Sequence, residues 1–347
     1  MLAEGGSRLN KTSIEWAKGA GGQGFTWNPV KGCSMAPGSE AGGCLQCYAC
    51  RMAARGLPKM RFSDGSPLAH TTASGPRWTG RVELNEIKLD EPLRRRKPAV
   101  IFVNSMSDLY HEKLPDEVID RVQATIALAW WHKYISLTKR AKRQREYWTT
   151  KGRPARIAEA VIATAVSLGL KTTGICGPAA VAEGVAGGWK LPHAHQILGV
   201  SVEDHDHLYR LDYLRDTPAA CRMLSAEPLL GDLGEISHRL VGIDWVVGGF
   251  ESGPGARPGN PEWARKLRDD CVSAGVPFLW KQNGEWAPAI AGVWFSPLEG
   301  GPQFQTRAGG KDTHDFGNGY GAVRIGKKAA GRLLDDKVWD QLPEVLR

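Results

Sequence analysis

Short apolar segments alternate with amphipathic segments along most of the chain beyond residue 99. The apolar segments have the length of strands, whereas the amphipathic ones repeat their apolar residues at helical spacing, as Ile119, Val122, Ile126 and Trp130 do. Strands that alternate with helices in this way are typical of βαβ units and a parallel sheet. The pattern therefore predicts an α/β fold.

The expected strands are rich in Val, Ile, Leu, Phe and Trp and are bounded by polar or turn-forming residues. They lie near residues 25–30 and at 99–105, 133–139, 195–204, 221–228, 243–253 and 277–282. Helices are expected between them, including helices within 115–131, 155–169 and 261–275. The result is a sheet of six or seven parallel strands in βα order.

Polar residues follow every expected strand at the point where the strand ends. They are Asn104, Ser105 and Asp108; Thr138, Lys139 and Arg140; Ser201 and Glu203; Ser225 and Glu227; Gly248, Gly249 and Glu251; and Lys281 and Gln282. Ligands of parallel barrels and doubly wound sheets bind at the carboxyl ends of the strands. Polar residues also simply begin loops, but their recurrence after strand upon strand predicts one functional face.

Two segments interrupt this alternation. Residues 58–97 are rich in Gly, Pro, Ser and Arg and are interpreted as an insertion, and the segment from about 284 onward has the composition of loops and hairpins. A chain of 347 residues suits one large domain with a smaller appendage. We therefore expect a main domain over 1–283, with a cysteine-bearing loop at 28–55, and an extension over 284–347.

The formal charge of +8 is unevenly distributed. Basic residues concentrate at 94–97 and 138–145, and thirteen Trp residues are available for base stacking as well as for the core. A nucleic-acid surface needs such a balance, although a solvated basic face is the commoner meaning of one run. The residues predicted to hold phosphates are Arg94, Arg95, Arg96, Lys139, Arg140, Lys142 and Arg143, and the insertion at 58–97 is expected to contact the nucleic-acid backbone as well.

No apolar stretch approaches the length of a membrane span, so no membrane association is expected. The seven cysteines lie in a long chain without an N-terminal apolar targeting segment, which does not resemble a small secreted disulfide scaffold. We expect reduced thiols and a cytoplasmic location.

Four of the cysteines, Cys33, Cys44, Cys47 and Cys50, lie within eighteen residues. Zinc sites commonly use two separated pairs of ligands, whereas a tight C-x2-C-x2-C run is familiar around cubane iron–sulfur clusters. An iron–sulfur cluster is therefore favoured over zinc, with either Cys44, Cys47 and Cys50 or Cys33, Cys44 and Cys47 as ligands. The residues after Cys47 are good helix formers, so Cys50 is expected one turn inside a helix.

Blocks spread over nearly the whole chain resemble a known family. They include "FTWNPVKGC", "GCLQCYACRMAAR", "FVNSMSDLYH", "LGVSVED", "CRMLSAEPLLG", "IDWVVGGFESGPGARP" and "PFLWKQNGEW". These blocks resemble the radical-SAM-like proteins of phages and bacteria long described only as a phage domain of unknown function, which are distantly similar to spore photoproduct lyases. Two features depart from the usual radical SAM pattern: the first cysteine gap is ten residues, and the aromatic residue, Tyr48, follows the last cysteine.

The resemblance implies a partial (β/α)6-type TIM-like barrel of the radical SAM superfamily. Its three cysteines fall on Cys33, Cys44 and Cys47, which would hold a [4Fe-4S] cluster whose fourth iron binds S-adenosylmethionine, and Cys50 is outside the pattern. By the same resemblance, Ser201 and Glu203 would hold the ribose hydroxyls, although Asp204 and Glu203 could also cap the next helix. The full set expected at the cofactor is Tyr48, Asn104, Ser105, Ser201, Glu203, Ser225, Gly248 and Gly249.

The candidate catalytic residues are Glu227, Glu251, Lys281 and His111. The two carboxylates could orient a substrate amine, or equally could form structural ion pairs with Lys281 or Arg140. His111 could move a proton, but a single histidine is more often structural. Gly248 and Gly249 lack the Lys-Ser/Thr that a triphosphate loop requires, so they are expected to allow close approach of the cofactor to the backbone.

Charge, tryptophan content and the resemblance together make DNA the expected substrate. The expected reaction is a radical rearrangement of a thymine that carries an amino-acid adduct, in a flipped or single-stranded base. The expected protein is a monomer that draws on an external electron donor such as a flavodoxin.

Other classes remain open from the residues alone. One is a radical SAM enzyme acting on a protein or a small metabolite, and another is a DNA-repair lyase of the photoproduct type. A third is a DNA-binding protein in which zinc staples the cysteines. A metal hydrolase built on His193, His195, His205 and His207 is the least favoured. His193 and His195 have no partner carboxylate at a recognisable spacing, and His205 and His207 lie at an expected helix start, where alternate residues diverge.

Overall fold

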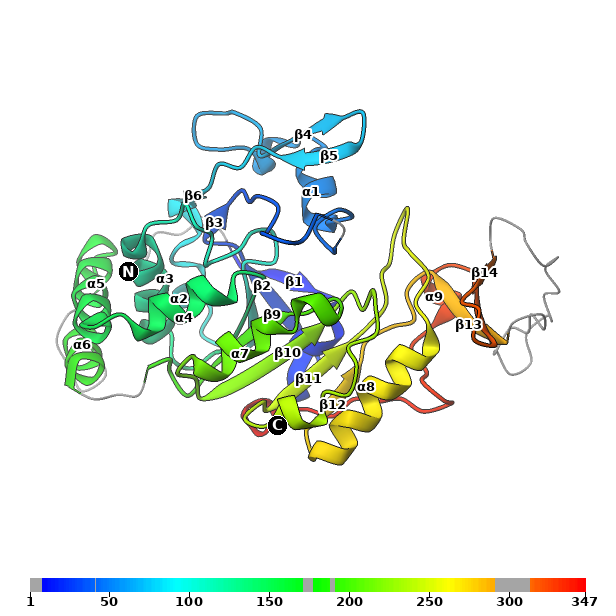
Figure 1. Ribbon diagram of the computed structural model, residues 1–347. Helices are drawn as coiled ribbons and strands as arrows, with labels where there is room; N and C mark the ends of the chain where they lie inside the picture. The colour runs from blue at the N-terminus through cyan, green and yellow to red at the C-terminus, as the bar shows by residue number, and fades with distance from the viewer. Residues whose placement is uncertain (1–7, 41, 171–176, 188–190, 291–312) are drawn as a thin grey trace.

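The computed structural model describes residues 8–40, 42–170, 177–187, 191–290 and 313–347, and a curled eight-stranded sheet forms its centre (Figure 1). The strand order is β1-β2-β7-β8-β9-β10-β11-β12, in which only β1 (Asn10–Thr12) is antiparallel to its neighbour. The seven parallel strands are β2 (Gly24–Trp27), β7 (Val100–Val103), β8 (Lys133–Thr138), β9 (Gln196–Ser201), β10 (Cys221–Ala226), β11 (Trp245–Gly248) and β12 (Phe278–Trp280). The predicted α/β fold is confirmed, and its sheet is a barrel-like half-cylinder.

Helices connect successive parallel strands. They are α3 (Asp116–Leu128), α4 (Ala141–Thr149), α5 (Arg153–Ser167), α6 (Pro178–Gly187), η4 (His205–His207), α7 (Tyr209–Asp216), η5 (Ser237–Leu240) and α8 (Pro261–Ala274). Ile119, Val122 and Ile126 of α3 are fully buried, as their spacing predicts. Trp130 was expected on the same face, but α3 ends at Leu128 and Trp130 is half exposed.

The two faces of the sheet have separate apolar cores. Ile101 and Val103 of β7 pack on the helix side, whereas Phe102 points to the other side, because side chains alternate along a strand. On that inner side the core is completed by Trp16 of η1 (Glu15–Gly21) and Leu346 of η6 (Glu344–Leu346). Both ends of the described chain therefore help to fill the half-barrel.

The insertion forms a small lobe above the sheet (Figure 1). In chain order it contains α1 (Tyr48–Ala53), η2 (Pro58–Met60) and a hairpin of β4 (Ala69–Thr72) and β5 (Gly75–Trp78). The hairpin packs on α1. Cys50, Phe62 and Leu68 form its own buried core. The chain then returns to the sheet through β6 (Glu83–Leu84), which pairs with β3 (Val30–Lys31), and through η3 (Glu86–Lys88) and α2 (Glu91–Arg94).

The C-terminal extension contains a three-stranded antiparallel sheet of β13 (Trp286–Ile290), β15 (Tyr320–Arg324) and β14 (Thr313–Asp315), followed by α9 (Lys327–Ala330). Part of the expected loop and hairpin region, residues 291–312, lies outside the described residues. The last segment returns to the sheet: Trp280 N donates to Trp339 O at 2.9 Å, and Trp245 Nε1 donates to Gln341 O at 2.9 Å. In the described part of the chain, no helix has the length and apolarity needed to cross a membrane.

Candidate functional site

A cavity of about 420 Å³ lies at the carboxyl ends of the parallel strands. Six neighbouring strands, β7 to β12, each contribute at least one polar side chain at or just after their ends. These side chains include Asn104, Ser105, Thr138, Lys139, Ser201, Ser225, Glu227, Glu251, Lys281 and Gln282. The prediction that the strand ends share one face is therefore confirmed. The apolar part of the wall includes Trp16, Phe102 and Phe250.

Three of the four clustered cysteines open into this cavity. Cys33 follows β3, Cys44 lies in the loop, and Cys47 is the residue from which α1 begins. All three are free thiols and half-buried. Cys50 lies inside α1, is buried against the core of the insertion and does not line the cavity, as the helical reading of this segment predicted. The loop therefore presents three thiols to the cavity and keeps the fourth apart.

Burial raises the pKa of the Cys33 thiol, and the nearby Arg140 guanidinium only partly opposes this effect. Burial likewise raises the pKa of Cys47. Both thiols thus hold their protons at neutral pH in the protein alone, and a metal that bound there would have to displace them. A buried thiol that is stable only when protonated or metal-bound is suited to a metal ligand rather than to a free nucleophile.

Cys33, Cys44 and Cys47 all line the cavity, and Cys44 and Cys47 lie near enough to Cys33 to act electrostatically on its thiol. Among the described residues, no group of three or more His, Cys, Asp or Glu side chains is gathered closely enough to hold one metal ion. A tetrahedral zinc staple requires four donors on a single ion. A cubane cluster instead takes each thiolate on a different iron, so its ligands stand further apart. The loop thus presents an all-sulfur donor set to the cavity, and the choice of an iron–sulfur cluster over zinc stays a prediction.

Ser34, next to Cys33, is clamped by two side chains from the strand ends. Its Oγ accepts hydrogen bonds from His111 Nε2 at 2.7 Å and from Arg140 Nη2 at 2.9 Å. The Nδ1 atom of His111 accepts from Lys113 N, so Nε2 carries the proton, and burial lowers the pKa of this ring. His111 was expected as a proton carrier in the site, but it does not line the cavity and instead positions the cysteine loop.

The rest of the cysteine loop is held in the same manner. His207 Nε2 contacts Gly38 O at 2.9 Å, Arg210 Nη2 donates to Ser39 Oγ at 3.0 Å, and Arg257 Nη2 donates to Gly42 O at 3.3 Å. These anchors come from the segments that follow β9 and β11. The protein therefore fixes the loop through its own side chains, and the thiols are presented in an ordered frame.

Glu203 is completely buried behind this loop and does not line the cavity. Its carboxylate pairs with Lys139 on one oxygen and with Arg210 on the other, the latter at 2.7 Å. Burial opposes its ionisation, but the charges of Lys139 and Arg210 outweigh it and lower the pKa to about 2. The expected contact with ribose hydroxyls is thus wrong for Glu203, because both oxygens are already used by cations. Ser201, at the end of β9, does line the cavity.

Glu227 and Lys281 form an ion pair on the cavity wall, with Nζ 3.0 Å from Oε1. Trp16 Nε1 donates to the other oxygen of Glu227 at 2.8 Å, and Ser225 Oγ lies 3.5 Å from it. Glu251 also lines the cavity, but Arg257 binds both of its oxygens, at 2.8 and 2.9 Å. Glu227 and Lys281 therefore offer charge to a ligand, whereas Glu251 anchors a loop.

Asn104 combines a left-handed backbone conformation with a buried side-chain amide that has no partner in the protein. Its φ is 60°, its side chain is 3% exposed, and it lines the cavity. Neither its Nδ2 nor its Oδ1 atom has a hydrogen-bond partner. Asparagine tolerates the left-handed region better than most residues, but an unpartnered buried amide costs about 1–3 kcal/mol. A donor and an acceptor are thus held ready for a polar ligand group.

The other residues expected at the cofactor have mixed positions. Ser105 and Tyr48 line the cavity, and the Tyr48 hydroxyl donates to Ser105 O, which ties α1 to the end of β7. Gly248 and Gly249 do not line it. A Cβ on Gly248 would lie 3.0 Å from the Trp280 ring, and one on Gly249 would lie 3.3 Å from Lys281 Cβ. Packing in the sheet therefore accounts for Gly248, whereas the space beside Gly249 is bordered by the cavity residues Glu227, Lys281 and Gln282.

Most of the residues predicted to bind phosphates are occupied within the protein. Arg94 pairs with Asp90, Arg143 pairs with Asp116, and Arg95 lies 4.1 Å from the Phe25 ring centroid. Arg140 is buried between Asp108 and Glu112, and Lys139 faces the cavity and Glu203. The remaining two, Arg96 and Lys142, are exposed, and Lys142 pairs with Glu146 at 3.9 Å. The prediction of a phosphate-binding surface at these two runs is therefore wrong for Arg140 and weakened for the rest.

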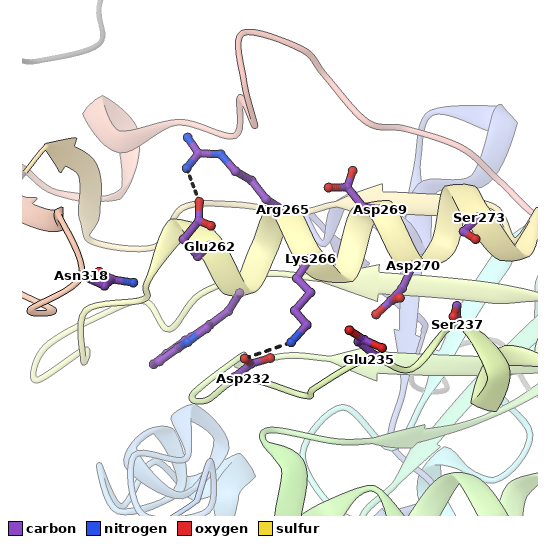
Figure 2. Close-up of a pocket in the computed structure, with 11 residues that line it drawn as sticks. Asp232, Glu235, Ser237, Glu262, Arg265, Lys266, Asp269, Asp270, Ser273 and Asn318 are labelled. Carbon is purple, nitrogen blue, oxygen red and sulfur yellow. Dashed lines mark hydrogen bonds and ion pairs between the residues drawn. The ribbon is translucent and has the colours of Figure 1, made fainter.

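A larger hollow of about 730 Å³ lies beside α8, away from the strand ends (Figure 2). Its walls carry charges that pair with one another: Lys266 with Asp232 at 3.3 Å, and Arg265 with Glu262 at 2.8 Å. No cysteine lines it. The four histidines considered for a hydrolase do not gather either, because two precede β9 and two follow it. The candidate site is therefore the cavity at the strand ends.

Several residues of the site had no signal in the sequence. Trp16 comes from the N-terminal segment, Arg51 from α1, Trp78 from the insertion and Lys327 from the C-terminal extension, and all four line the cavity. Trp16 lies 211 residues from Glu227, its hydrogen-bond partner. Only the fold brings these segments together, since no local spacing connects them.

The model of a known protein family matches residues 11–343 of this chain, and the description of that family is "Protein of unknown function (DUF5131)". The matched residues include the cysteine loop, all seven parallel strands and most of the segment that returns to the sheet. No curated protein and no solved structure matches the chain. Because the match extends over nearly the whole sequence, the chain belongs to this family of proteins of unknown function.

Proposed function

We propose that this protein is a radical S-adenosylmethionine enzyme that rearranges a modified thymine in DNA. Cys33, Cys44 and Cys47 would hold a [4Fe-4S] cluster, and S-adenosylmethionine would bind beside it. The observation that carries the proposal is the meeting of three free thiols from one loop with the polar ends of parallel strands in a single cavity. When bound, the cluster and S-adenosylmethionine would supply a carbon-centred radical that takes a hydrogen atom from the substrate.

The residues of the chain would then bind, orient and shield. The unpartnered amide of Asn104 offers one donor and one acceptor to the polar part of S-adenosylmethionine. Ser201 and Ser225 add hydroxyl groups to the same wall. Trp16, Phe102 and Phe250 supply apolar surface that excludes water from a reactive intermediate. The clamp on Ser34 keeps Cys33 at the cavity before any ligand arrives.

Glu227 and Lys281 are the groups proposed to orient the substrate. An amino-acid adduct on a base carries an amine and a carboxylate, and the Glu227–Lys281 pair presents one charge for each. Trp16 fixes the orientation of Glu227 through its indole N–H. We propose the adduct-bearing thymine as substrate on this complementarity, on the basic charge of the chain, and on the resemblance of its motifs to radical-SAM-like phage and bacterial proteins.

The test is anaerobic turnover. Protein reconstituted with iron and sulfide is incubated with a chemical reductant, S-adenosylmethionine and DNA that carries the thymine adduct, and the products are separated by mass spectrometry. We expect 5′-deoxyadenosine and an altered nucleoside. The variant Lys281→Met should still yield some 5′-deoxyadenosine but lose the altered nucleoside, whereas Lys266→Met, in the hollow beside α8, should behave as the wild type. Absence of both products from the wild type would contradict the proposal.

A further inference from the structure

The lobe made of α1 and the first part of the insertion carries most of the excess positive charge of the chain. Residues 48–81, here called the basic lobe, contain six Lys or Arg residues and a single acidic residue, Asp64, in a chain whose net charge is +8. Neither of the two basic runs predicted to bind phosphates lies within it, although the lobe includes the first part of the insertion that was expected to contact the nucleic-acid backbone. The lobe stands above the sheet, where α1, β4 and β5 are seen in Figure 1.

The positive charges of the basic lobe are largely uncompensated. Asp64 is taken by Arg81 at 2.5 Å. Arg61 donates to the carbonyl oxygens of Gly56 and Gly65, Arg51 to that of Pro254 and Arg77 to that of Pro76. Within the described ranges, no carboxylate forms an ion pair with Arg51, Arg55, Lys59, Arg61 or Arg77. Arg55, Lys59 and Arg61 are also exposed, which leaves them free to meet an external anion.

This contrasts with the two runs chosen from sequence. There, Arg140 and Arg143 are paired with carboxylates from other segments, and Arg94 is paired with Asp90 one turn earlier. A charge already neutralised by a protein carboxylate releases no counterion when a phosphate approaches, so it adds little to nucleic-acid affinity. The basic lobe therefore has the stronger attraction for a polyanion.

Aromatic and apolar side chains lie beside these charges. Tyr48 is 50% exposed, Leu57 44% and Met52 38%. Trp78, at the end of β5, lines the cavity together with Tyr48 and Arg51. Exposed aromatic rings between cations are the pattern by which proteins hold single-stranded nucleic acids, since rings stack on bases while cations follow the phosphates. Trp78 connects the lobe directly to the candidate active site.

We propose that the basic lobe binds the DNA strand next to the nucleotide whose base enters the cavity. Arg55, Lys59 and Arg61 contact backbone phosphates, and Trp78 stacks on the base at the cavity wall. The identity of the strand as DNA rests on the proposed function, whereas the charge and aromatic character of the lobe do not. Binding to the lobe needs neither cluster nor S-adenosylmethionine, so it can be tested separately from the chemistry.

The first experiment measures the affinity of the full chain, without cluster, for a fluorescein-labelled single-stranded oligonucleotide by anisotropy at several salt concentrations. The triple variant Arg55→Ala/Lys59→Ala/Arg61→Ala is compared with Arg96→Ala/Lys97→Ala/Lys142→Ala, which removes the same charge from exposed positions of the two runs chosen from sequence. The lobe variant should bind at least about tenfold more weakly and lower the slope of log affinity against log salt by about 2. The control should change affinity less than about twofold.

Equal losses in the two triple variants, or no loss in the lobe variant, would overturn the proposal. Thermal unfolding of both variants identifies any loss that comes from misfolding. If the lobe proposal fails this test but 5′-deoxyadenosine still forms, the proposed radical chemistry stands. If the lobe binds the oligonucleotide as expected but no 5′-deoxyadenosine forms, the radical chemistry fails and the lobe proposal stands.

The second experiment separates stacking from packing at Trp78, which is partly buried against the lobe core. Trp78→Ala should weaken binding of the normal oligonucleotide about fivefold or more, in line with the loss of one stacked base. An oligonucleotide that lacks the bases but keeps sugars and phosphates should bind the variant and the wild type equally. Equal weakening on both probes would mean that Trp78 only supports the lobe and would overturn the stacking contact.

Discussion

The buried carboxylate of Glu203 should carry a measurable part of the stability of the half-barrel. It is 0% exposed and pairs with Lys139 and Arg210, which lower its pKa to about 2 from an ordinary value of 4.5. Because the folded protein favours the ionised form, this group stabilises folding at pH values above about 4.5. The difference between the two pKa values corresponds to about 3 kcal/mol, which is lost as the pH falls toward 2.

The variant Glu203→Gln keeps the shape of the side chain but leaves Lys139 and Arg210 without a counter-charge. Removing one partner of a buried ion pair costs about 3–5 kcal/mol, so the free energy of unfolding at pH 7 should fall by about 3 kcal/mol. Urea unfolding followed by circular dichroism measures this change at pH 7 and at intervals down to pH 3. The gap between wild type and variant should narrow as the pH falls below about 4.5.

The matched control is Glu86→Gln. Glu86 pairs with Arg121 at 2.7 Å, but both side chains are well exposed, so the loss should not exceed about 1 kcal/mol. Equal losses in the two variants at pH 7 would refute the reasoning, since burial would then make no difference to the value of the pair. A gap for Glu203→Gln that stayed constant down to pH 3 would also refute it, because the effect would not come from the ionised carboxylate.

Three further changes test how the site is built. Asn104→Gly keeps the backbone conformation but removes the unpartnered amide. Calorimetry should show that S-adenosylmethionine binds about tenfold more weakly, while the stability of the ligand-free protein is not reduced. A less stable variant would mean that the amide has a structural role. Arg140→Gln weakens the hydrogen bonds that hold Ser34 beside Cys33. In the cluster-free protein, thiol labelling followed by peptide mapping should find that Cys33 is modified about tenfold faster in the variant than in the wild type. An unchanged labelling rate would mean that Arg140 does not hold the cysteine loop in place. Gly284→Ala places a Cβ 2.0 Å from Glu251 O at a φ of +74°, so the free energy of unfolding should fall by more than about 2 kcal/mol. The control Gly242→Ala has a similar φ but no close neighbour, so the free energy of unfolding should fall by about 1 kcal/mol. Equal losses in the two variants would contradict the clash.

The order of strands and helices was predictable because each parallel strand is buried on both faces and reads as an apolar run. The polar residues that follow those apolar runs predicted the location of the cavity, because the carboxyl ends of parallel strands meet at one edge of the sheet. The place of Cys50 inside a helix followed from helix propensity, whereas its separation from the cavity comes from packing against Phe62 and Leu68 of the insertion. Local rules were sufficient wherever the outcome depended on neighbours in the sequence.

The roles of charged residues were not predictable, because their partners come from distant segments. Arg140 belongs to a basic run that suggests an exposed face, yet Asp108 and the loop at Ser34 bury it. Ser34 and Arg140 are 106 residues apart. Glu203 reads as a ligand at a strand end, but Lys139 and Arg210 use both of its oxygens. A run of like charges indicates a surface only when the fold brings no opposite charge to it.

The central claim is that three of the four clustered cysteines hold an iron–sulfur cluster. The most direct measurement is anaerobic reconstitution with iron and sulfide of the wild type and of Cys33→Ser, Cys44→Ser, Cys47→Ser and Cys50→Ser, with iron, sulfide and zinc content and electron paramagnetic resonance as readouts. The wild type and Cys50→Ser should each take up about four irons and four sulfides per chain with the signal of a reduced cubane, and the other three variants should lose it. Zinc alone in the wild type, or a cluster that survives without Cys33 and is lost without Cys50, would contradict the account.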